Sequence, residues 1–304
     1  MAYGKYTEIP SPAGKASGVF ADIKEFFSMQ YKGNGITQYI VNNKLDGYFF
    51  SAKNTWLLLY GKKEGDVPVP RLLAFVCEVN DGYECTAEQK KNLYDAVVIS
   101  KELNLPLLAI RFKKNCNDVA VTEKGVPTRL ITYSELKEKF QKEYSVIPKA
   151  EHGNKDINAY SSSSYHDWQR QALGGIVVTD LDLVKIDRHN ETIEKIFELK
   201  RSRTFINYWT PYPEDSMNFC LIINAIVASK KNIPFHLLYN RYEMIDGNRI
   251  DDISKMSVFA FDVPWESGTF ISPENVKWKR LCYLPPSSVI PVGENPSSST
   301  AGRS

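Results

Sequence analysis

The chain has 304 residues, of which 38 are Lys or Arg and 36 are Asp or Glu, so its formal net charge is +2. Hydrophobic residues make up 43% of the chain and charged residues 24%, values that are typical of globular proteins and exclude wholesale disorder. The balance of charge excludes a histone-like protein but leaves room for a basic patch on one face. At roughly 150 residues per domain, the length predicts two domains.

Cysteine and histidine spacing argues against a disulfide scaffold and against a zinc site. The five cysteines are odd in number and form no C-x-x-C pair, and the four histidines show no H-E-x-x-H spacing. This pattern predicts a reducing, cytoplasmic location. Residues 1–18 contain no apolar core of signal-peptide length, and the apolar runs of the chain are strand-sized, so we expect no membrane segment.

In chain order, the first half predicts three strands, a helix and a further strand. The strands are expected over residues 46–50, 56–60 and 72–79, the helix over 86–103 and the last strand over 107–112. Apolar residues recur at helical spacing in the helix, and Asn104-Leu-Pro is expected to end it.

Two stretches rich in Ser, Gly, Pro or Asn, residues 145–164 and 285–304, are typical of flexible segments. The first divides the chain, so we predict a domain over residues 1–148, a second over 160–284 and a disordered tail over 285–304. The expected fold class is α/β, with two lobes that each contain a small mixed sheet flanked by helices.

The second half predicts a similar order of elements. A helix is expected over residues 165–173, strands over 176–186 and 192–200, an apolar helix over 214–230 and a strand over 235–239. The passages 99–111 and 228–239 both run from helix to strand across Asn and Pro. They indicate either tandem copies of one fold or merely a common helix stop, and the sequence leaves both interpretations open.

The strongest chemical signal is Asp180-Leu-Asp-Leu-Val-Lys-Ile followed by Phe197-Glu-Leu-Lys-Arg. Because alternate residues of a strand share a face, Asp180 and Asp182 are expected on one face. By the same argument Glu198 and Lys200 share a face of the next strand. The polar connection 187–191 predicts a hairpin that makes the two strands neighbours. Three carboxylates and one ammonium group would then meet on an otherwise apolar sheet.

Close carboxylates repel one another unless a cation lies between them. Mg²⁺, or Mn²⁺ in its place, is the natural candidate, because it prefers oxygen ligands and needs only one or two carboxylates. Such an ion lowers the pKa of a bound water and neutralises charge on a phosphate. Lys200 is placed to orient that water, to help deprotonate it and to offset phosphate charge.

An Asp, a gap of fifteen residues and then Glu-x-Lys resembles the PD-(D/E)xK nuclease superfamily. The resemblance covers about residues 160–245, lacks the Pro before the Asp and includes no recognisable specificity element. It implies a restriction-endonuclease-like fold for the C-terminal lobe. It also implies that Asp182, Glu198 and the carbonyl of Leu199 bind the metal, and that Asp182, Glu198 and Lys200 are the catalytic residues.

The neighbouring residues suggest supporting roles. Asp180 lies beside the metal-binding Asp, and the preceding helix offers Gln169 and Asp167, because that helix in the superfamily often lends an acidic or amide group. Basic residues near the site are candidates for phosphate contacts, although ordinary surface charge explains each of them equally well. These candidates are Arg201, Arg203, Lys230, Lys231 and Arg241.

The first half contains a faint echo of this pattern, Asp46 followed by Glu78-Val-Asn80, which lacks the lysine. It indicates either a degenerate copy that grips substrate or a purely structural set of residues. The reverse assignment, with a catalytic first half and Lys90 or Lys113 as its lysine, needs more assumptions.

The sequence therefore predicts a Mg-dependent endonuclease that hydrolyses phosphodiester bonds of nucleic acid, with DNA favoured over RNA. One alternative is a non-catalytic module with a decayed site that binds nucleic acid or protein. Another is a hydrolase of a smaller phosphate ester. A single competent site would imply a homodimer or a nicking enzyme. The sequence leaves open the recognition sequence, endo- or exonuclease action and the oligomeric state.

Overall fold

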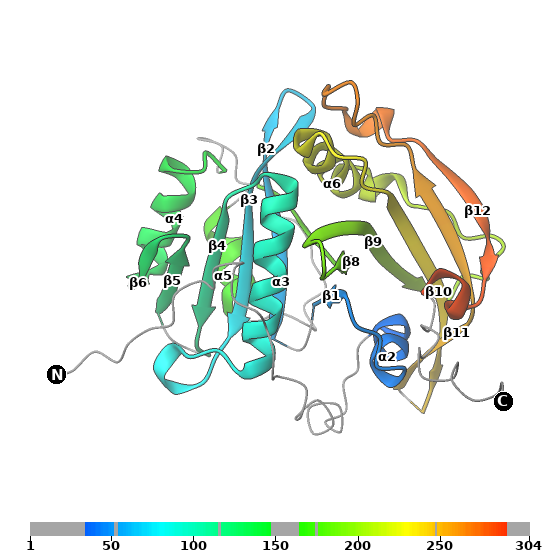
Figure 1. Cartoon of the computed structure of the whole chain (residues 1–304), viewed down its shortest axis with the longest axis horizontal. Coiled ribbons are helices and arrows are strands. Elements are labelled where there is room, and N and C mark those ends of the chain that lie inside the picture. The colour runs from blue at the N-terminus through cyan, green and yellow to red at the C-terminus, as the bar shows by residue number, and fades with distance from the viewer. Residues whose placement is uncertain are drawn as a thin grey trace, which may run out of the picture.

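The computed structural model describes residues 34–51, 54–114, 117–146, 164–173, 176–246 and 248–290. It shows an α/β protein with two mixed sheets of six strands each, flanked by helices (Figure 1). The predicted domain boundary at 148–160 lies outside the described residues. So does most of the predicted tail, although Pro286–Val289 form a helix, α7, and Ile290 is fully buried beside it.

The elements of each half follow in chain order. The first half contains α2 (Gly35–Asn42), β1 (Tyr48–Phe50), β2 (Thr55–Glu64), β3 (Val67–Glu78), α3 (Ala87–Leu103), β4 (Leu107–Phe112), β5 (Asp118–Glu123), β6 (Val126–Thr132) and α4 (Tyr133–Lys142). The second half contains α5 (Ser164–Leu173), β7 (Val177–Asp180), β8 (Leu183–Asp187), β9 (Thr192–Ser202), α6 (Ser216–Ser229), β10 (Phe235–Ile245), β11 (Asn248–Phe261), β12 (Trp278–Leu284) and α7.

The predicted helix and strand in the middle of the first half are confirmed. A capping box starts α3, because the Thr86 side chain accepts from the N–H of Gln89 and the Gln89 side chain accepts from the N–H of Thr86. Asn104 ends the helix in the left-handed conformation, at φ 53°, and Pro106 precedes β4. The helix stop seen in the sequence therefore has a local physical cause.

The first sheet has the strand order β6-β5-β4-β3-β2-β7, and the second has β1-β8-β9-β10-β11-β12. In each sheet, two consecutive strands form an antiparallel hairpin. A helix follows, then a strand parallel to the second hairpin strand, and then two further antiparallel strands. The similar order of elements predicted for the two halves is thus a repeated topology. The remaining edge strand of each sheet, β7 or β1, comes from the other half of the chain.

The prediction of one continuous strand over residues 176–186 was wrong. The chain pairs with β2 up to Asp180, passes through Leu181 and Asp182, and then pairs with β9 from Leu183 onward. The cause is the exchange of edge strands, which needs the chain to cross from the first sheet to the second at this point. The crossing falls within the predicted acidic cluster.

Helices α3 and α6 lie between the two sheets and contact both of them (Figure 1). Helix α3 packs on β3 and β4 of the first sheet and on β9 of the second. Helix α6 packs on β3 and β7 of the first sheet, and its Phe219 contacts Phe235 and Phe261 of the second. The largest hydrophobic core therefore joins residues of both sheets, such as Leu73 of β3, Ile223 of α6 and Leu237 of β10. This shared core holds β7 and β9 in fixed positions relative to each other.

An ion pair ties the β8–β9 turn to α3. Arg188 donates to both carboxylate oxygens of Asp95 at 2.7 and 3.1 Å, and its Nε donates to Asp46 at 2.9 Å. Asp95 is fully buried, and its burial raises the pKa of its carboxyl against the effect of Arg188. Asp46, part of the predicted echo, therefore has a structural role beside the strand crossing.

Replacing Arg188 by Ala should destabilise the protein by about 3–5 kcal/mol, because the substitution leaves the Asp95 carboxylate buried without its partner. Urea denaturation followed by circular dichroism measures the loss. The matched control is Lys101→Ala, which removes a solvent-exposed ion pair to Glu191 and should cost less than about 1 kcal/mol. Equal losses for the two variants would mean that the Arg188–Asp95 pair does not hold the turn in place.

Candidate functional site

The hairpin formed by β8 and β9 brings Asp182 and Glu198 face to face. Leu183 pairs with Phe197 and Val184 with Ile196, so the same antiparallel register places Asp182 opposite Glu198. Directly opposite residues share a face, with Cβ atoms about 4.5–5.5 Å apart. The Asp182 Oδ2 accepts a hydrogen bond of 2.9 Å from the N–H of Leu199. The predicted hairpin is therefore confirmed, and it joins these two acids.

Glu198 and Lys200 both point toward the side of β9 that α6 covers, because strand residues alternate between faces and Ile196 lies in the core on that side. The Nζ of Lys200 lies 3.1 Å from Oε1 of Glu198 and 3.2 Å from Oδ2 of Asp215. Lys200 is thus held between two carboxylates, one on its own strand and one at the start of α6.

Asp215 is the residue that sequence reasoning missed. It ends a short 3₁₀ turn, Pro213–Asp215, and occupies the N-cap position of α6. An N-cap Asp normally accepts from the first turn of its helix, but the Asp215 side chain makes no such bond and pairs with Lys200 instead. The sequence signal was a Pro-Glu-Asp-Ser helix start, which marks a cap and does not show what the cap contacts.

Burial dominates the electrostatics of the three acids. Burial, with the nearby Asp182 carboxylate, raises the pKa of Glu198 to about 8. Burial and the Glu198 carboxylate raise the pKa of Asp180 to about 6. Burial and Asp180 raise the pKa of Asp182 to about 6, against the opposing N–H of Leu199. At neutral pH the cluster therefore keeps a proton, which Glu198 holds most tightly.

Lys200 keeps its positive charge. Burial disfavours the charged ammonium group, but the carboxylates of Glu198, Asp215 and Asp182 outweigh it and raise the pKa of Lys200. The residue is therefore suited to stabilise negative charge. It is poorly suited to accept a proton, as the sequence-based role in deprotonating water would require.

Asp182 and Glu198 carry the carboxylates of this cluster that could serve as cation ligands. Glu198 is only 4% exposed, and its Oε2 has no hydrogen-bond partner among the described residues. A buried oxygen without a partner is costly unless it is protonated or meets a cation. The described chain contains no group of three or more His, Cys, Asp or Glu side chains placed to hold one ion. An ion bound by Asp182 and Glu198 would leave most of its ligand positions to water or phosphate, as is common for Mg²⁺.

Gln169, a supporting residue predicted from α5, contacts β2 rather than the three acids. Gln169 is buried, and its Oε1 accepts from the hydroxyl of Tyr60, which also lies 3.0 Å from the hydroxyl of Tyr165. Burial, Tyr165 and the Asp180 carboxylate all raise the pKa of Tyr60. Gln169 therefore holds Tyr60, which lies near Asp180, on the face of the first sheet that α6 does not cover. Asp167 lies in the first turn of α5.

The predicted phosphate contacts are scattered. Arg201 lies on the opposite face of β9 from Lys200 and pairs with Asp251 at 2.8 Å. Lys231 pairs with Glu102 of α3 at 2.5 Å. Lys231 and the neighbouring Lys230 follow the C-terminal end of α6, roughly 20 Å along the helix from Asp215 at about 1.5 Å per residue.

The other two predicted contacts lie together, just beyond β9. Arg203 is exposed, and its carbonyl accepts a hydrogen bond of 3.4 Å from Nε of Arg241. The Arg241 guanidinium lies 4.5 Å from the centre of the Phe205 ring and also pairs with Glu243 at 3.0 Å. These two arginines are the candidates that the structure brings near the end of β9.

The first sheet carries no equivalent acidic cluster in its described residues. Leu107 of β4 pairs with Leu73, and the equivalent Phe235 of β10 pairs with Ile196, so Phe75 and Cys77 occupy the positions of Glu198 and Lys200. Both residues are fully buried. The same comparison of registers aligns Asp182 with Leu57, which is also fully buried. The equivalent positions of the first sheet therefore lie in its hydrophobic core.

The acidic pattern predicted in the first half does not occupy the strand positions equivalent to those of the second half. Glu78 lies three positions beyond Phe75, the true equivalent of Glu198, and so points to the other face of β3. Asp46 is bound by Arg188. A gap of 31 residues separates Asp46 from Glu78, against 15 between Asp182 and Glu198, so the two spacings do not correspond.

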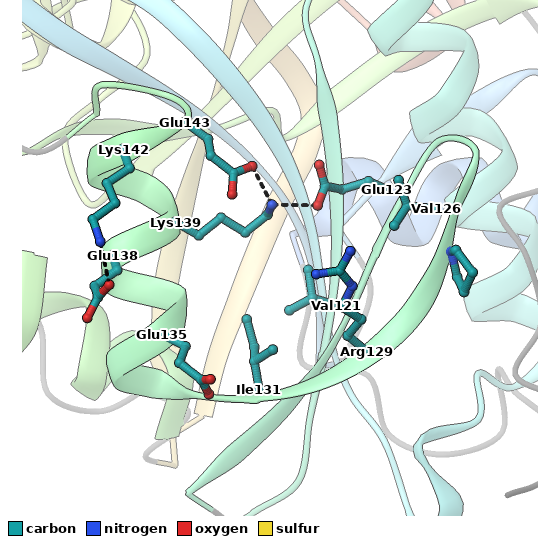
Figure 2. A pocket seen from close by; sticks show the side chains of 11 residues that line it. Val121, Glu123, Val126, Arg129, Ile131, Glu135, Glu138, Lys139, Lys142 and Glu143 are labelled. Atoms are coloured by element: carbon teal, nitrogen blue, oxygen red, sulfur yellow. Dashed lines mark hydrogen bonds and ion pairs between the residues drawn. The ribbon is translucent and has the colours of Figure 1, made fainter.

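A hollow of about 480 Å³ lies between β5, β6 and α4 (Figure 2). Lys139 lies across it, paired with Glu123 at 2.6 Å and with Glu143 at 2.5 Å. Since β6 and β7 are the opposite edges of the first sheet, the hollow lies roughly 20 Å or more from Asp180 at about 4.8 Å per strand. It is separate from the acidic cluster.

Comparison of the chain with models of known protein families finds no match, and comparison with curated protein sequences finds none either. Among the helices of the described residues, none is long and apolar enough to cross a membrane.

Replacing Glu198 by Gln should raise the melting temperature of the metal-free protein, by more at about pH 9 than at about pH 6. The pKa of Glu198 is about 8 in the folded protein and about 4.3 in an unfolded chain, so its ionisation destabilises the fold increasingly as pH rises between these values. Gln cannot ionise and so removes this cost. Thermal melts in EDTA measure the effect.

The matched control is Glu194→Gln, since Glu194 is exposed on the same strand. Its melting temperature should follow that of the parent at both pH values. A Glu198→Gln gain that does not depend on pH would show that Glu198 is not held protonated by the cluster.

Proposed function

We propose that Asp182, Glu198 and Lys200 form the active site of a metal-dependent phosphodiesterase that acts on nucleic acid, with DNA favoured over RNA. The observation that carries the proposal is the buried, unpartnered Oε2 of Glu198, opposite Asp182 and beside the Lys200 ammonium group. The hairpin, helix and parallel strand around it also agree with a restriction-endonuclease-like reading of the second half.

Asp182 and Glu198 are the residues that would hold the cation. When bound, a Mg²⁺ or Mn²⁺ ion supplies a water of lowered pKa and offsets charge on the phosphate. The chain's own residues set the conditions for this chemistry. Glu198 would have to lose its proton to hold a cation, because a protonated carboxyl is a poor ligand. The Leu199 N–H holds Asp182 in its orientation.

Lys200 stabilises the negative charge that develops on a phosphate during hydrolysis. Its raised pKa keeps it cationic, and its position between Glu198 and Asp215 limits the motion of the ammonium group. A cation fixed in advance where charge develops contributes more than one that must reorganise during the reaction. Asp215 is therefore a positioning residue for Lys200.

One observation favours a second candidate, a nucleic-acid-binding module with a decayed site. Lys200 already has two carboxylate partners, and Asp182 already accepts a backbone hydrogen bond, so the cluster is partly satisfied without an ion. The two candidates differ in whether a divalent cation binds and whether DNA is cut.

Divalent cations should raise the melting temperature of the protein, and the rise should grow with pH up to about 8. The ion must displace the Glu198 proton, so its affinity should fall by up to about tenfold for each pH unit below that pKa. Thermal melts with and without Mg²⁺ or Mn²⁺, at matched ionic strength, measure this. Glu198→Gln should abolish the shift. No shift near pH 8 would favour the decayed site.

Cleavage of plasmid and single-stranded DNA in Mg²⁺ or Mn²⁺ tests the activity directly. Asp182→Asn and Lys200→Ala should each lower the cleavage rate by about 100-fold or more, because they remove a metal ligand and the phosphate-stabilising charge. Lys142→Ala, at an exposed lysine of α4, is the control and should cut like the parent. If both site variants cut as well as the parent, the site lies elsewhere.

A further inference from the structure

The loop of residues 203–212 is bracketed by the proposed active site. It begins just after Lys200 at the end of β9 and leads into Asp215 at the start of α6. Because Lys200 and Asp215 are ion-paired at 3.2 Å, the two ends of the loop meet at the acidic cluster. The loop therefore starts and ends beside the proposed active site.

Contacts with the protein interior hold the loop in place. Trp209 is 2% exposed and stacks on Tyr239, with ring centres 4.1 Å apart and planes within 3°. The Tyr239 hydroxyl donates to the carbonyl of Thr204 at 2.5 Å. Arg280 donates to the carbonyls of Asn207 at 3.1 Å and of Trp209 at 2.5 Å. The backbone of the loop is therefore fixed before any ligand arrives.

This fixed loop presents large aromatic rings to solvent. Phe205 is 61% exposed, Tyr208 is 80% exposed and Tyr212 is 45% exposed. Single exposed apolar residues are common and need no explanation. Three exposed rings on a short segment with an anchored backbone are different, because little backbone entropy is lost when a flat ligand stacks on them.

The charge of the loop favours an anionic partner. Within residues 203–212 the charged side chain is that of Arg203, which is exposed. The Arg241 guanidinium lies over one side of the Phe205 ring, at 4.5 Å from its centre. Rings interleaved with arginines suit a chain of bases and phosphates better than an apolar peptide or a lipid surface.

We propose that the 203–212 loop stacks unpaired bases, so that the nucleic acid cut at the acidic cluster is single-stranded or locally unpaired. This inference rests on the proposed function and specifies its substrate. In an intact duplex the faces of the bases are already stacked on one another and cannot reach Tyr208 or Phe205. Only unpaired bases offer a free face to the rings.

Fluorescence anisotropy in EDTA, where no cleavage occurs, tests the inference. The probes are a labelled mixed-sequence DNA strand of about 12 nucleotides and the same strand annealed to its complement. The parent should bind the single strand more tightly than the duplex. Tyr208→Ala and Phe205→Ala should each weaken single-strand binding by roughly 5- to 100-fold, which is the loss expected for one stacked base.

Two matched variants separate stacking from other effects. Tyr208→Phe keeps the ring and should bind the single strand like the parent. Leu130→Ala removes a similarly exposed apolar side chain, 54% exposed on β6 at the far edge of the first sheet, and should also bind like the parent. Because the replaced side chains are exposed, melting temperatures should be unchanged in all four variants.

The outcomes distinguish this inference from the proposed function. Tyr208-dependent binding of single strands without any cleavage in Mg²⁺ or Mn²⁺ would support the stacking role of the loop and overturn the proposed nuclease activity. Cleavage lost in Lys200→Ala, together with single-strand binding that Tyr208→Ala leaves unchanged, would support the nuclease and overturn the loop. Tighter binding of the duplex, or no binding of either probe, would also overturn the loop.

Discussion

The exchange of edge strands between the two sheets is the constraint on which the rest of the structure depends. β7 completes the first sheet and β1 completes the second, so each half of the chain supplies a strand to the sheet built by the other. The crossing at Leu181 and Asp182 then has to lie where the sheets approach each other. Because α3 and α6 pack against both sheets, the crossing cannot shift without disturbing the shared core.

The acidic cluster lowers the stability of the fold. Burial raises the pKa values of Asp180, Asp182 and Glu198, so each acid destabilises the fold when it ionises. Lys200 offsets part of that repulsion and is itself held by Asp215. A residue set chosen for stability alone would be apolar here, as it is at the equivalent positions Phe75 and Cys77 of the first sheet.

The parts of the fold that depend on neighbouring residues could be predicted from the sequence. The end of α3 at Asn104, the β8–β9 hairpin and the shared face of Glu198 and Lys200 all follow from local pattern and spacing. The contacts that could not be predicted join segments far apart in the sequence. Asp215 reaches Lys200 only because α6 folds back over β9, and Arg201 meets Asp251 of a later strand. The crossing at Leu181 has no local signal, since the residues on either side are all compatible with one long strand.

The exchanged strands also bear on how the chain can be divided. A cut between the halves would leave each fragment with a sheet that lacks its sixth strand, exposing β2 in one and β8 in the other. Each fragment would also carry a short strand whose own sheet is absent, with unpaired backbone groups along it. Neither fragment would be a self-sufficient domain, but each would hold the piece that completes the other. The halves are therefore complementary in the manner of a split protein, despite their repeated topology.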